Sequence, residues 1–263
     1  MISDKAHVDP SAKIGEGVTI HPFAFIDKDV EIGDGCVIMP FASIVRGTRM
    51  GRNCRIYQGA IVGADPQDFR WKGGFTYCHL GDNVVVRENV IINRGINPEE
   101  GATVIGEGTF LMANSHVGHD SHIGNNCVLG NNVSVAGDVK IGEKTILSSA
   151  VVVHENSSVG DWVLVKGGCR ITGHVPPYCI MAHNPTSYFG VNATILRKYG
   201  NMSEERIDDI AKCYRHIYQT GTSVFNALKR IQSDVDDTPE RQNIIDFING
   251  VNLRIVAIPK DLE

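Results

Sequence analysis

FLMANSHVGHDSHIG, at residues 110–124, decides the fold, because it carries an aliphatic side chain at every sixth position, at Leu111, Val117 and Ile123. The same six-residue period extends far beyond this stretch in both directions. It recurs in three blocks, the third one residue out of phase with the first two: Val8 to Val62, Leu80 to Ile92, and Ile105 to Ile171. We therefore treat most of the chain as one repeat.

A small side chain follows most of these aliphatic residues four positions later. Examples are Ala12, Ala24, Cys36, Ala42, Cys54, Ala60, Thr109, Ser115, Ser121 and Cys127. Glycine or asparagine stands at the bends, as in Gly33–Gly35 and Gly124–Asn126, which predicts short strands joined by tight turns. Three such units make one triangular coil of 18 residues, and coils stack at about 4.8 Å. The sequence predicts a parallel β-helix.

The repeat is interrupted twice. From Val62 to Leu80 the spacing equals one full coil, but the two positions between them hold Asp68 and Gly74. We expect the chain to leave the β-helix over residues 63–79, in a polar and aromatic loop. A second departure, over about 93–101, absorbs the shift in phase. Each segment is either a binding loop or a solvated connection.

The last quarter of the chain has a helical pattern. The repeat ends at the VPPY sequence of residues 175–178, and the pattern changes after residues 190–192. Capping residues and helix breakers predict three helices, over about 203–219, 223–233 and 238–250. We therefore expect two domains, a β-helix over residues 1–189 and a small helical domain over 190–263.

The helical domain differs in charge from the whole protein. Residues 190–230 hold seven Lys or Arg against four Asp or Glu, whereas the net charge of the chain is -5. Such a domain either covers the open end of the β-helix or attracts an acidic partner. An acidic chain of this kind is unlike a nucleic-acid-binding protein.

Cellular location follows from the first residues and from the cysteines. The N-terminal sequence does not resemble a secretory signal, and no apolar run approaches the length of a membrane span. The seven cysteines include no CxxC pair, which favours reduced thiols. We expect a cytoplasmic protein that does not insert into membranes, with four cysteines as fillers of the small inward position: Cys36, Cys54, Cys127 and Cys169.

Three histidines interrupt the repeat at residues 116, 119 and 122. His116 and His122 are six residues apart and should lie on adjacent faces of the triangle, with His119 near the corner between them. The H-x-x-H-D-x-H spacing is compatible with zinc only if other ligands complete the set, and none is in view. We predict no metal here, and the alternative for any one histidine is a solvated side chain.

Stacking arithmetic singles out His119. Eighteen residues further on, Gly137 should lie beside it, and His154 should lie two coils from Gly118. A histidine next to an approachable backbone N–H forms a base with an oxyanion donor, and Asp120 is placed to orient the imidazole. This arrangement favours direct acyl transfer to a hydroxyl group.

Three motifs carry a resemblance to a known family: NSHVGHD at 114–120, VPPY at 175–178 and FGVN at 189–192. With a hexad domain followed by a helical tail, the chain resembles the UDP-N-acetylglucosamine O-acyltransferase family. The resemblance implies a left-handed β-helix that forms a homotrimer with sites between subunits. It also implies the first step of lipid A biosynthesis, with an acyl carrier protein thioester as donor, UDP-N-acetylglucosamine as acceptor and no cofactor.

The resemblance also implies roles for individual residues. His119 matches the general base that removes a proton from the glucosamine 3-hydroxyl, Asp120 its partner, and Gly137 the oxyanion donor. Gly167 matches the residue that limits acyl chain length, where a glycine leaves room for a longer chain. The other matched residues would bind substrate: Gln67, Asp68, Arg70, His116, His154, Glu155, Asn192 and Lys198. Basic side chains of the helical domain, among them Arg197, Lys212 and Arg215, would steer the acidic carrier protein.

The sequence departs from the family pattern at four positions. Arg70 stands where lysine is usual, Asp138 in place of histidine, Glu155 in place of glutamine and Tyr199 in place of arginine. Arginine keeps the charge of lysine but not its geometry. We therefore expect the nucleotide contacts to differ from the usual ones.

Four alternatives remain from the sequence. The N-acyltransferase that acts later in the same pathway has a domain ahead of its repeat, whereas the period here begins at Val8. A CoA-dependent acetyltransferase of the same repeat type would use acyl-CoA as donor. A trimer resembling a zinc-dependent carbonic anhydrase would bind metal. A structural scaffold would have no activity to lose when His119 is changed.

Overall fold

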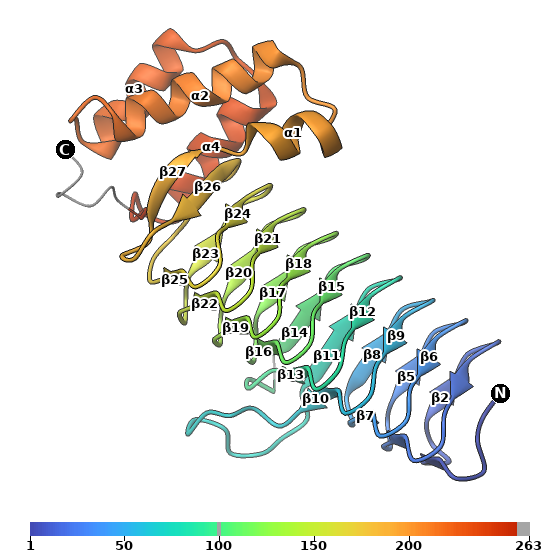
Figure 1. Cartoon of the computed structure of the whole chain (residues 1–263). Helices are drawn as coiled ribbons and strands as arrows, with labels where there is room; N and C mark the ends of the chain where they lie inside the picture. Colours follow the sequence, from blue (N-terminus) through green and yellow to red (C-terminus); the bar gives the residue numbers. More distant parts are fainter. Residues whose placement is uncertain (99–100, 257–263) are drawn as a thin grey trace.

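The computed structural model describes residues 1–98 and 101–256. Its β-strands form three sheets that are parallel apart from one antiparallel pair at the C-terminal end. Before that end, successive strands along the chain belong to successive sheets, so that each coil adds one strand to each sheet. Figure 1 shows the coils stacked from the N-terminus to the helices at the other end. The chain is a left-handed parallel β-helix, as predicted.

The strands of each sheet are short, most of them two residues long. Sheet 1 contains β1 His7–Val8, β4 Phe25–Ile26, β7 Ser43–Ile44, β10 Ile61–Ala64, β13 Ile91–Asn93, β16 His116–Val117, β19 Ser134–Val135, β22 Val152–Val153 and β25 Arg170–Ile171. Sheet 2 contains β2 Lys13–Ile14, β5 Glu31–Ile32, β8 Thr48–Met50, β11 Tyr77–Leu80, β14 Ala102–Ile105, β17 His122–Ile123, β20 Lys140–Ile141 and β23 Ser158–Val159. Sheet 3 contains β3 Thr19–Ile20, β6 Val37–Ile38, β9 Arg55–Ile56, β12 Val85–Val86, β15 Phe110–Leu111, β18 Val128–Leu129, β21 Ile146–Leu147, β24 Leu164–Val165, β26 Cys179–Ala182 and β27 Ser187–Val191.

The six-residue period determines both the register and the core. Val117 pairs with Val135, and Val135 with Val153, each eighteen residues further along the chain. These aliphatic residues are fully buried along the axis of the β-helix. All seven cysteines are free and buried, including the four that the sequence assigned to inward positions. Apolar burial along this axis stabilises the stack.

The first interruption is shorter than predicted and has a different geometry. Strands β10 and β11 extend into both ends of the predicted loop, which leaves residues 65–76 outside the β-helix. The chain leaves the β-helix between Val62 and Leu80 as predicted, and these two residues lie in consecutive strands of one coil. As a result Leu80 pairs with Met50, thirty residues earlier. The second interruption lies between β13 and β14, and residues 99 and 100 of it are outside the described residues.

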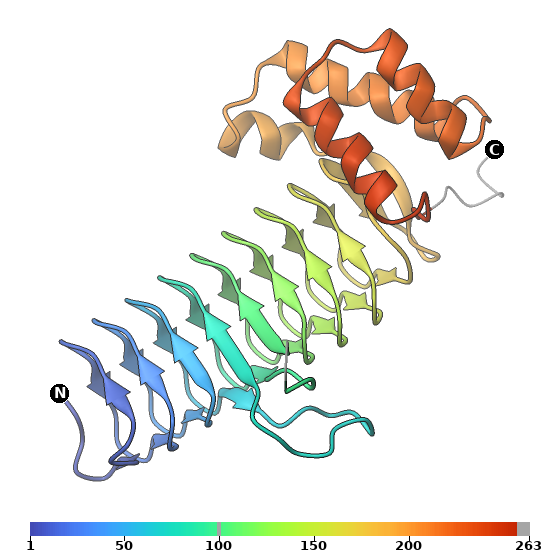
Figure 2. The same ribbon diagram turned by 180° about the vertical axis from the view of Figure 1, so that it is seen from behind.

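The β-helix continues further than the sequence indicated. After residues 175–178, β26 pairs parallel with β24, and β27 turns back to pair antiparallel with β26. The predicted division between residues 189 and 190 falls inside β27. Figure 2 shows the helices packed over this end of the stack.

Four helices follow: α1 Ala193–Tyr199, α2 Glu204–Tyr218, α3 Val224–Asp234 and α4 Pro239–Gly250. The sequence predicted the last three, and Ser203 caps α2 by accepting a hydrogen bond from the Arg206 N–H. It did not predict α1. Asn243 of α4 joins the helices to the last coils by donating to Asp161 and to the Tyr178 hydroxyl. Within the described residues, no helix is both long and apolar enough to span a membrane.

Candidate active site

The candidate site lies at the corner between sheets 1 and 2, where the chain turns from β16 to β17. Asp120 has a φ of 55° there, a left-handed conformation that aspartate tolerates better than most residues. The turn holds the His119 side chain against the next coil, with 5 % of the residue exposed. A Cβ on Gly137 would overlap the imidazole ring. The predicted stacking of these two residues is confirmed.

Both nitrogens of His119 face a carboxylate. Nδ1 lies 2.8 Å from Oδ2 of Asp120, which also accepts a hydrogen bond from the backbone N–H of Ile96 at 2.9 Å. Nε2 lies 3.3 Å from Oδ2 of Asp68, a residue of the 65–76 loop. Asp120 therefore orients the ring, as the sequence indicated, and Nε2 is the nitrogen that faces the loop.

The 65–76 loop folds back over this corner. Arg70 donates to both oxygens of Asp68, from Nε at 3.0 Å and from Nη2 at 2.9 Å. These bonds, together with the Arg70 backbone N–H, hold the pKa of Asp68 well below its usual range. Asp68 is thus a carboxylate, an acceptor for a donor group on a ligand.

A buried asparagine that sequence reasoning missed connects the loop to His116. Asn93 is 1 % exposed, and its Nδ2 donates to the carbonyl of Asp65 at 2.6 Å. Its Oδ1 therefore faces Nε2 of His116, 2.9 Å away, and accepts a hydrogen bond from it. Nε2 of His116 therefore carries a proton, which it donates to Asn93. Burial lowers the pKa of His116, and a hydrogen bond with the backbone of Val135 acts in the opposite direction.

These side chains surround a pocket of about 290 Å³. Six predicted residues line it: Gln67, Asp68, His116, His119, Gly137 and Glu155. Asn93, Gly118 and Ala136 complete the lining and were not predicted. Asn93 ends the last strand before the second interruption. This position in the sequence was the available signal that the chain changes direction at Asn93.

Two further predicted residues, His154 and Gly167, lie outside this pocket. His154 lies two coils above Gly118, and its Nε2 is 3.1 Å from Nη2 of Arg170. Because arginine is always a donor, Nε2 of His154 is the acceptor in this pair. Gly167 lies in the turn between β24 and β25, at the corner between sheets 3 and 1, three coils beyond His119.

The chain matches known acyltransferases over nearly its whole length. The model of the family described as UDP N-acetylglucosamine O-acyltransferase, domain 2, matches residues 174–256, and the bacterial transferase hexapeptide model matches 102–137. The acyl-[acyl-carrier-protein]--UDP-N-acetylglucosamine O-acyltransferase of Alkalilimnicola ehrlichii is 40 % identical, over 97 % of this chain and 98 % of that protein. The chain belongs to the UDP-N-acetylglucosamine O-acyltransferase family. It is an acyltransferase.

Solved structures of this family have the same fold. The UDP-N-acetylglucosamine acyltransferase of Bacteroides fragilis is 42 % identical to this chain, with a TM-score of 0.94. The match covers 99 % of this chain and 100 % of that chain. The enzyme of Francisella novicida is 32 % identical with a TM-score of 0.95, over 100 % of this chain and 96 % of its own. The predicted resemblance is therefore confirmed.

Two residues predicted from this acyltransferase family lie far from His119 within the chain. Asn192 precedes α1, is 1 % exposed and donates from Nδ2 to the carbonyl of Trp162. The Nζ of Lys198 lies over the ring of Tyr199. Helix α1 follows β27 at the end of sheet 3, whereas His119 lies at the corner of sheets 1 and 2 (Figure 1). One chain does not bring these two groups together.

The three histidines of this acyltransferase do not converge. His116 belongs to sheet 1 and His122 to sheet 2, as the period predicted. Among the described residues, the ligand-type atoms of His119, Asp120 and Asp138 lie within 4.8 Å of one another. This set has one histidine and two carboxylates, and neither His116 nor His122 belongs to it.

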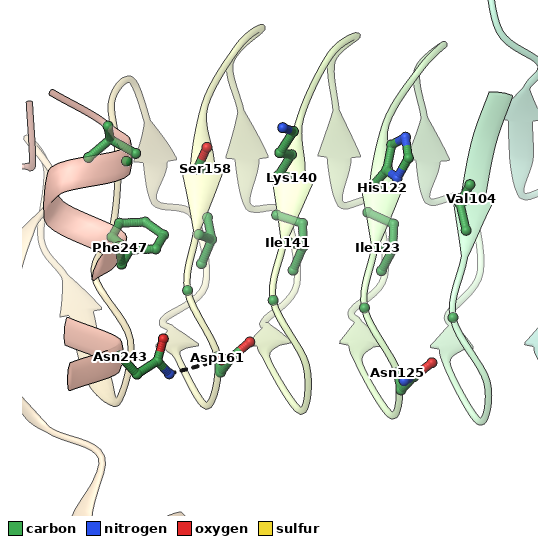
Figure 3. Close-up of a pocket in the computed structure, with 17 residues that line it drawn as sticks. Val104, His122, Ile123, Asn125, Lys140, Ile141, Ser158, Asp161, Asn243 and Phe247 are labelled. Atoms are coloured by element: carbon green, nitrogen blue, oxygen red, sulfur yellow. Dashed lines mark hydrogen bonds between the residues drawn. The ribbon is translucent and has the colours of Figure 1, made fainter. Parts of the chain in front are cut away.

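A larger groove of about 790 Å³ runs along sheet 2 to helix α4 (Figure 3). His122, Lys140 and Ser158 point outward in a row on its floor, and Phe247 closes one end. Its depth arises from glycines that have no room for a side chain, because a Cβ at Gly124 would approach the next coil within 2.8 Å. His122, Lys140 and Asp161 line this groove, but in the described part of the chain no hydrogen bond or ion pair joins His122 to a carboxylate, unlike His119.

Proposed function

We propose that this acyltransferase moves a 3-hydroxyacyl group from an acyl carrier protein to the glucosamine 3-hydroxyl of UDP-N-acetylglucosamine, the first step of lipid A biosynthesis. The names of its relatives support this donor and this acceptor. The observation that carries the proposal is the His119–Asp120 pair held against Gly137 in a pocket lined by polar side chains. No cofactor takes part in the proposed reaction.

In the proposed mechanism, Nε2 of His119 removes the proton of the 3-hydroxyl as its oxygen attacks the thioester carbonyl. Asp120 accepts the Nδ1 hydrogen bond and stabilises the charge that forms on the ring. The backbone N–H of Gly137 stabilises the oxyanion of the tetrahedral intermediate. The intermediate then collapses, the carbon–sulfur bond breaks, and His119 returns the proton to the departing thiolate.

The sugar hydroxyl must enter between Asp68 and Nε2 of His119 for this reaction, because Nε2 accepts the hydroxyl proton. Asp68 remains ionised and next to the base, where it accepts a hydrogen bond from a hydroxyl of the sugar. His116, Gln67 and Glu155 line the same pocket and complete the proposed sugar site. The acyl chain would cross sheet 1 past His154 towards Gly167, a rise of about 14 Å over three coils.

We further propose that the active form is a cytoplasmic homotrimer. The separation of Asn192 and Lys198 from His119 within one chain supports this, because a neighbouring copy has to supply the nucleotide contacts if these residues make them. The basic side chains near α1 and α2 would face the acidic carrier protein.

The test uses purified protein, UDP-N-acetylglucosamine and a panel of 3-hydroxyacyl carrier protein thioesters, with the matching acyl-CoA thioesters as a control. We expect a 3-O-acylated product by mass spectrometry from carrier thioesters, and faster transfer of long chains than of short ones. The His119→Ala protein should keep its fold and lose activity by about 10²–10⁴-fold. Equal rates with acyl-CoA would favour the CoA-dependent alternative, and an unaffected His119→Ala protein would exclude this base.

A further inference from the structure

Arg70 is the centre of a cluster of charged side chains that joins the 65–76 loop to the β-helix. Besides its two hydrogen bonds to Asp68, it donates from Nη2 to Oε1 of Glu155 at 2.8 Å. The same nitrogen lies 3.6 Å from Oδ2 of Asp138. We call Asp68, Arg70, Asp138 and Glu155 the Arg70 cluster.

The cluster spans three levels of the stack. Asp68 lies at the level of His119, Asp138 follows Gly137 on the next coil, and Glu155 lies on the coil after that. The loop and the two coils are thus held by one guanidinium group. Three positions at which this sequence departs from the family pattern, Arg70, Asp138 and Glu155, meet here in space.

The geometry requires arginine. An exposed ion pair contributes little by itself, about 0–1 kcal/mol, and the side chains of Arg70 and Glu155 are 57 % and 49 % exposed. A planar guanidinium, however, donates to both oxygens of Asp68 and to Glu155 at once, which the single ammonium of lysine does not reproduce. The cluster therefore acts as a unit, in which each carboxylate helps to fix the group that holds the others.

We propose that Arg70 is a positioning residue, anchored by Glu155 and Asp138, that places Asp68 against Nε2 of His119. This role differs from the direct substrate contact that the sequence predicted for Arg70. Its Nε and Nη2 are engaged within the cluster, and it reaches the base only through Asp68. The kinetic part of the proposal rests on the proposed acyl transfer, whereas the structural part does not.

A double-mutant cycle with Arg70→Lys, Glu155→Gln and the combined protein tests the kinetic part. If Arg70 acts through the cluster, each single change misplaces Asp68 and lowers kcat/KM for UDP-N-acetylglucosamine several-fold or more. The combined protein should then be at least as active as the less active of the two single variants, because the effects of changing two residues in contact do not simply add. Effects of the two changes that multiply in the combined protein would overturn the positioning role in favour of independent substrate contacts.

Hydrogen exchange of the 65–76 backbone tests the structural part without any substrate. Arg70→Lys and Glu155→Gln should each increase exchange in this loop and leave the rest of the β-helix unchanged. Arg52→Lys is the matched control, because Arg52 also donates from Nε and Nη2 to an aspartate, to Oδ2 of Asp82, away from the site. Unaltered exchange in the Arg70→Lys loop would overturn the proposal, whether or not acyl transfer is detected.

Discussion

The imidazole of His119 lies against Gly137 of the next coil, where any other residue would place its Cβ. This contact follows from the eighteen-residue coil and the turn that carries His119. The close approach puts the proposed base next to a backbone N–H, which is the geometry that acyl transfer requires. The absence of a side chain at residue 137 is therefore part of the proposed site.

Gly137→Ala should abolish most activity while leaving the fold intact. The new methyl group displaces the imidazole from its place beside Asp120, so we expect kcat to fall by about 10²-fold or more, as for removal of a general base. Steady-state kinetics and circular dichroism measure the two effects. Gly250→Ala is the control, since a Cβ at residue 250 meets no atom within 4 Å. An active Gly137→Ala protein would exclude the proposed geometry.

Asp120→Asn should lower kcat with little change in KM. The carboxylate accepts from Nδ1 of His119 and from the Ile96 N–H, and it stabilises the imidazolium that forms during transfer. A neutral amide fills the same space without that charge and favours the wrong tautomer, an effect of up to about 10⁴-fold in a comparable catalytic pair. Steady-state rates measured with a single acyl carrier protein thioester are enough to test this expectation. A loss of less than threefold would show that Asp120 has only a structural role.

Asn93→Ala should destabilise the protein and reduce transfer. The change leaves the Asp65 carbonyl and the His116 N–H without their partner, and an unsatisfied buried group costs about 1–3 kcal/mol. Urea unfolding measures the change in the free energy of unfolding. The exposed Asn131→Ala is the matched control. Equal stability of the two variants would contradict the proposed link between loop and pocket.

The sequence was sufficient for the scaffold because a period of six fixes which residues face inward and which residues stack. It placed Gly137 beside His119 and separated His116 from His122 for that reason. The period says nothing of segments that leave the β-helix. The path of residues 65–76 depends on long-range contacts such as Arg70 to Glu155, eighty-five residues apart in the sequence.

Residues whose roles depend on such contacts were the ones missed or misplaced. Asn93 looks like an ordinary turn residue until the loop brings Asp65 to it. Helix α1 is only seven residues long, and Asn192, although a residue type that favours N-caps, makes no side-chain cap hydrogen bond. The Asn192 side chain donates a hydrogen bond to the carbonyl of Trp162 in the same chain, and no local sequence pattern indicates this contact.

His116 should make stability depend on pH in a defined direction. Burial lowers its pKa in the folded protein, whereas in the unfolded chain the pKa is near 6.5. Below about pH 6.5 the unfolded state takes up a proton that the folded state does not, so the free energy of unfolding falls as the pH decreases until the folded pKa is passed. The loss of stability between pH 7.5 and 5.5 should be smaller in His116→Gln than in the original protein. His122→Gln, at an exposed position on sheet 2, is the control and should retain the full loss.

A shared site predicts that two inactive variants restore each other. His119→Ala lacks the proposed base, and Lys198→Ala lacks a proposed nucleotide contact that lies at the far end of the same chain. If neighbouring copies combine these residues into one site, trimers assembled from equal amounts of both variants contain some sites with both residues intact. Each mixed trimer then has one intact site in three, so the purified mixed trimers should show about a third of the full activity. Co-expressed subunits with two different affinity tags allow the mixed trimers to be purified and assayed. Activity no higher than that of the separate variants would show that His119 and Lys198 do not serve a site between subunits.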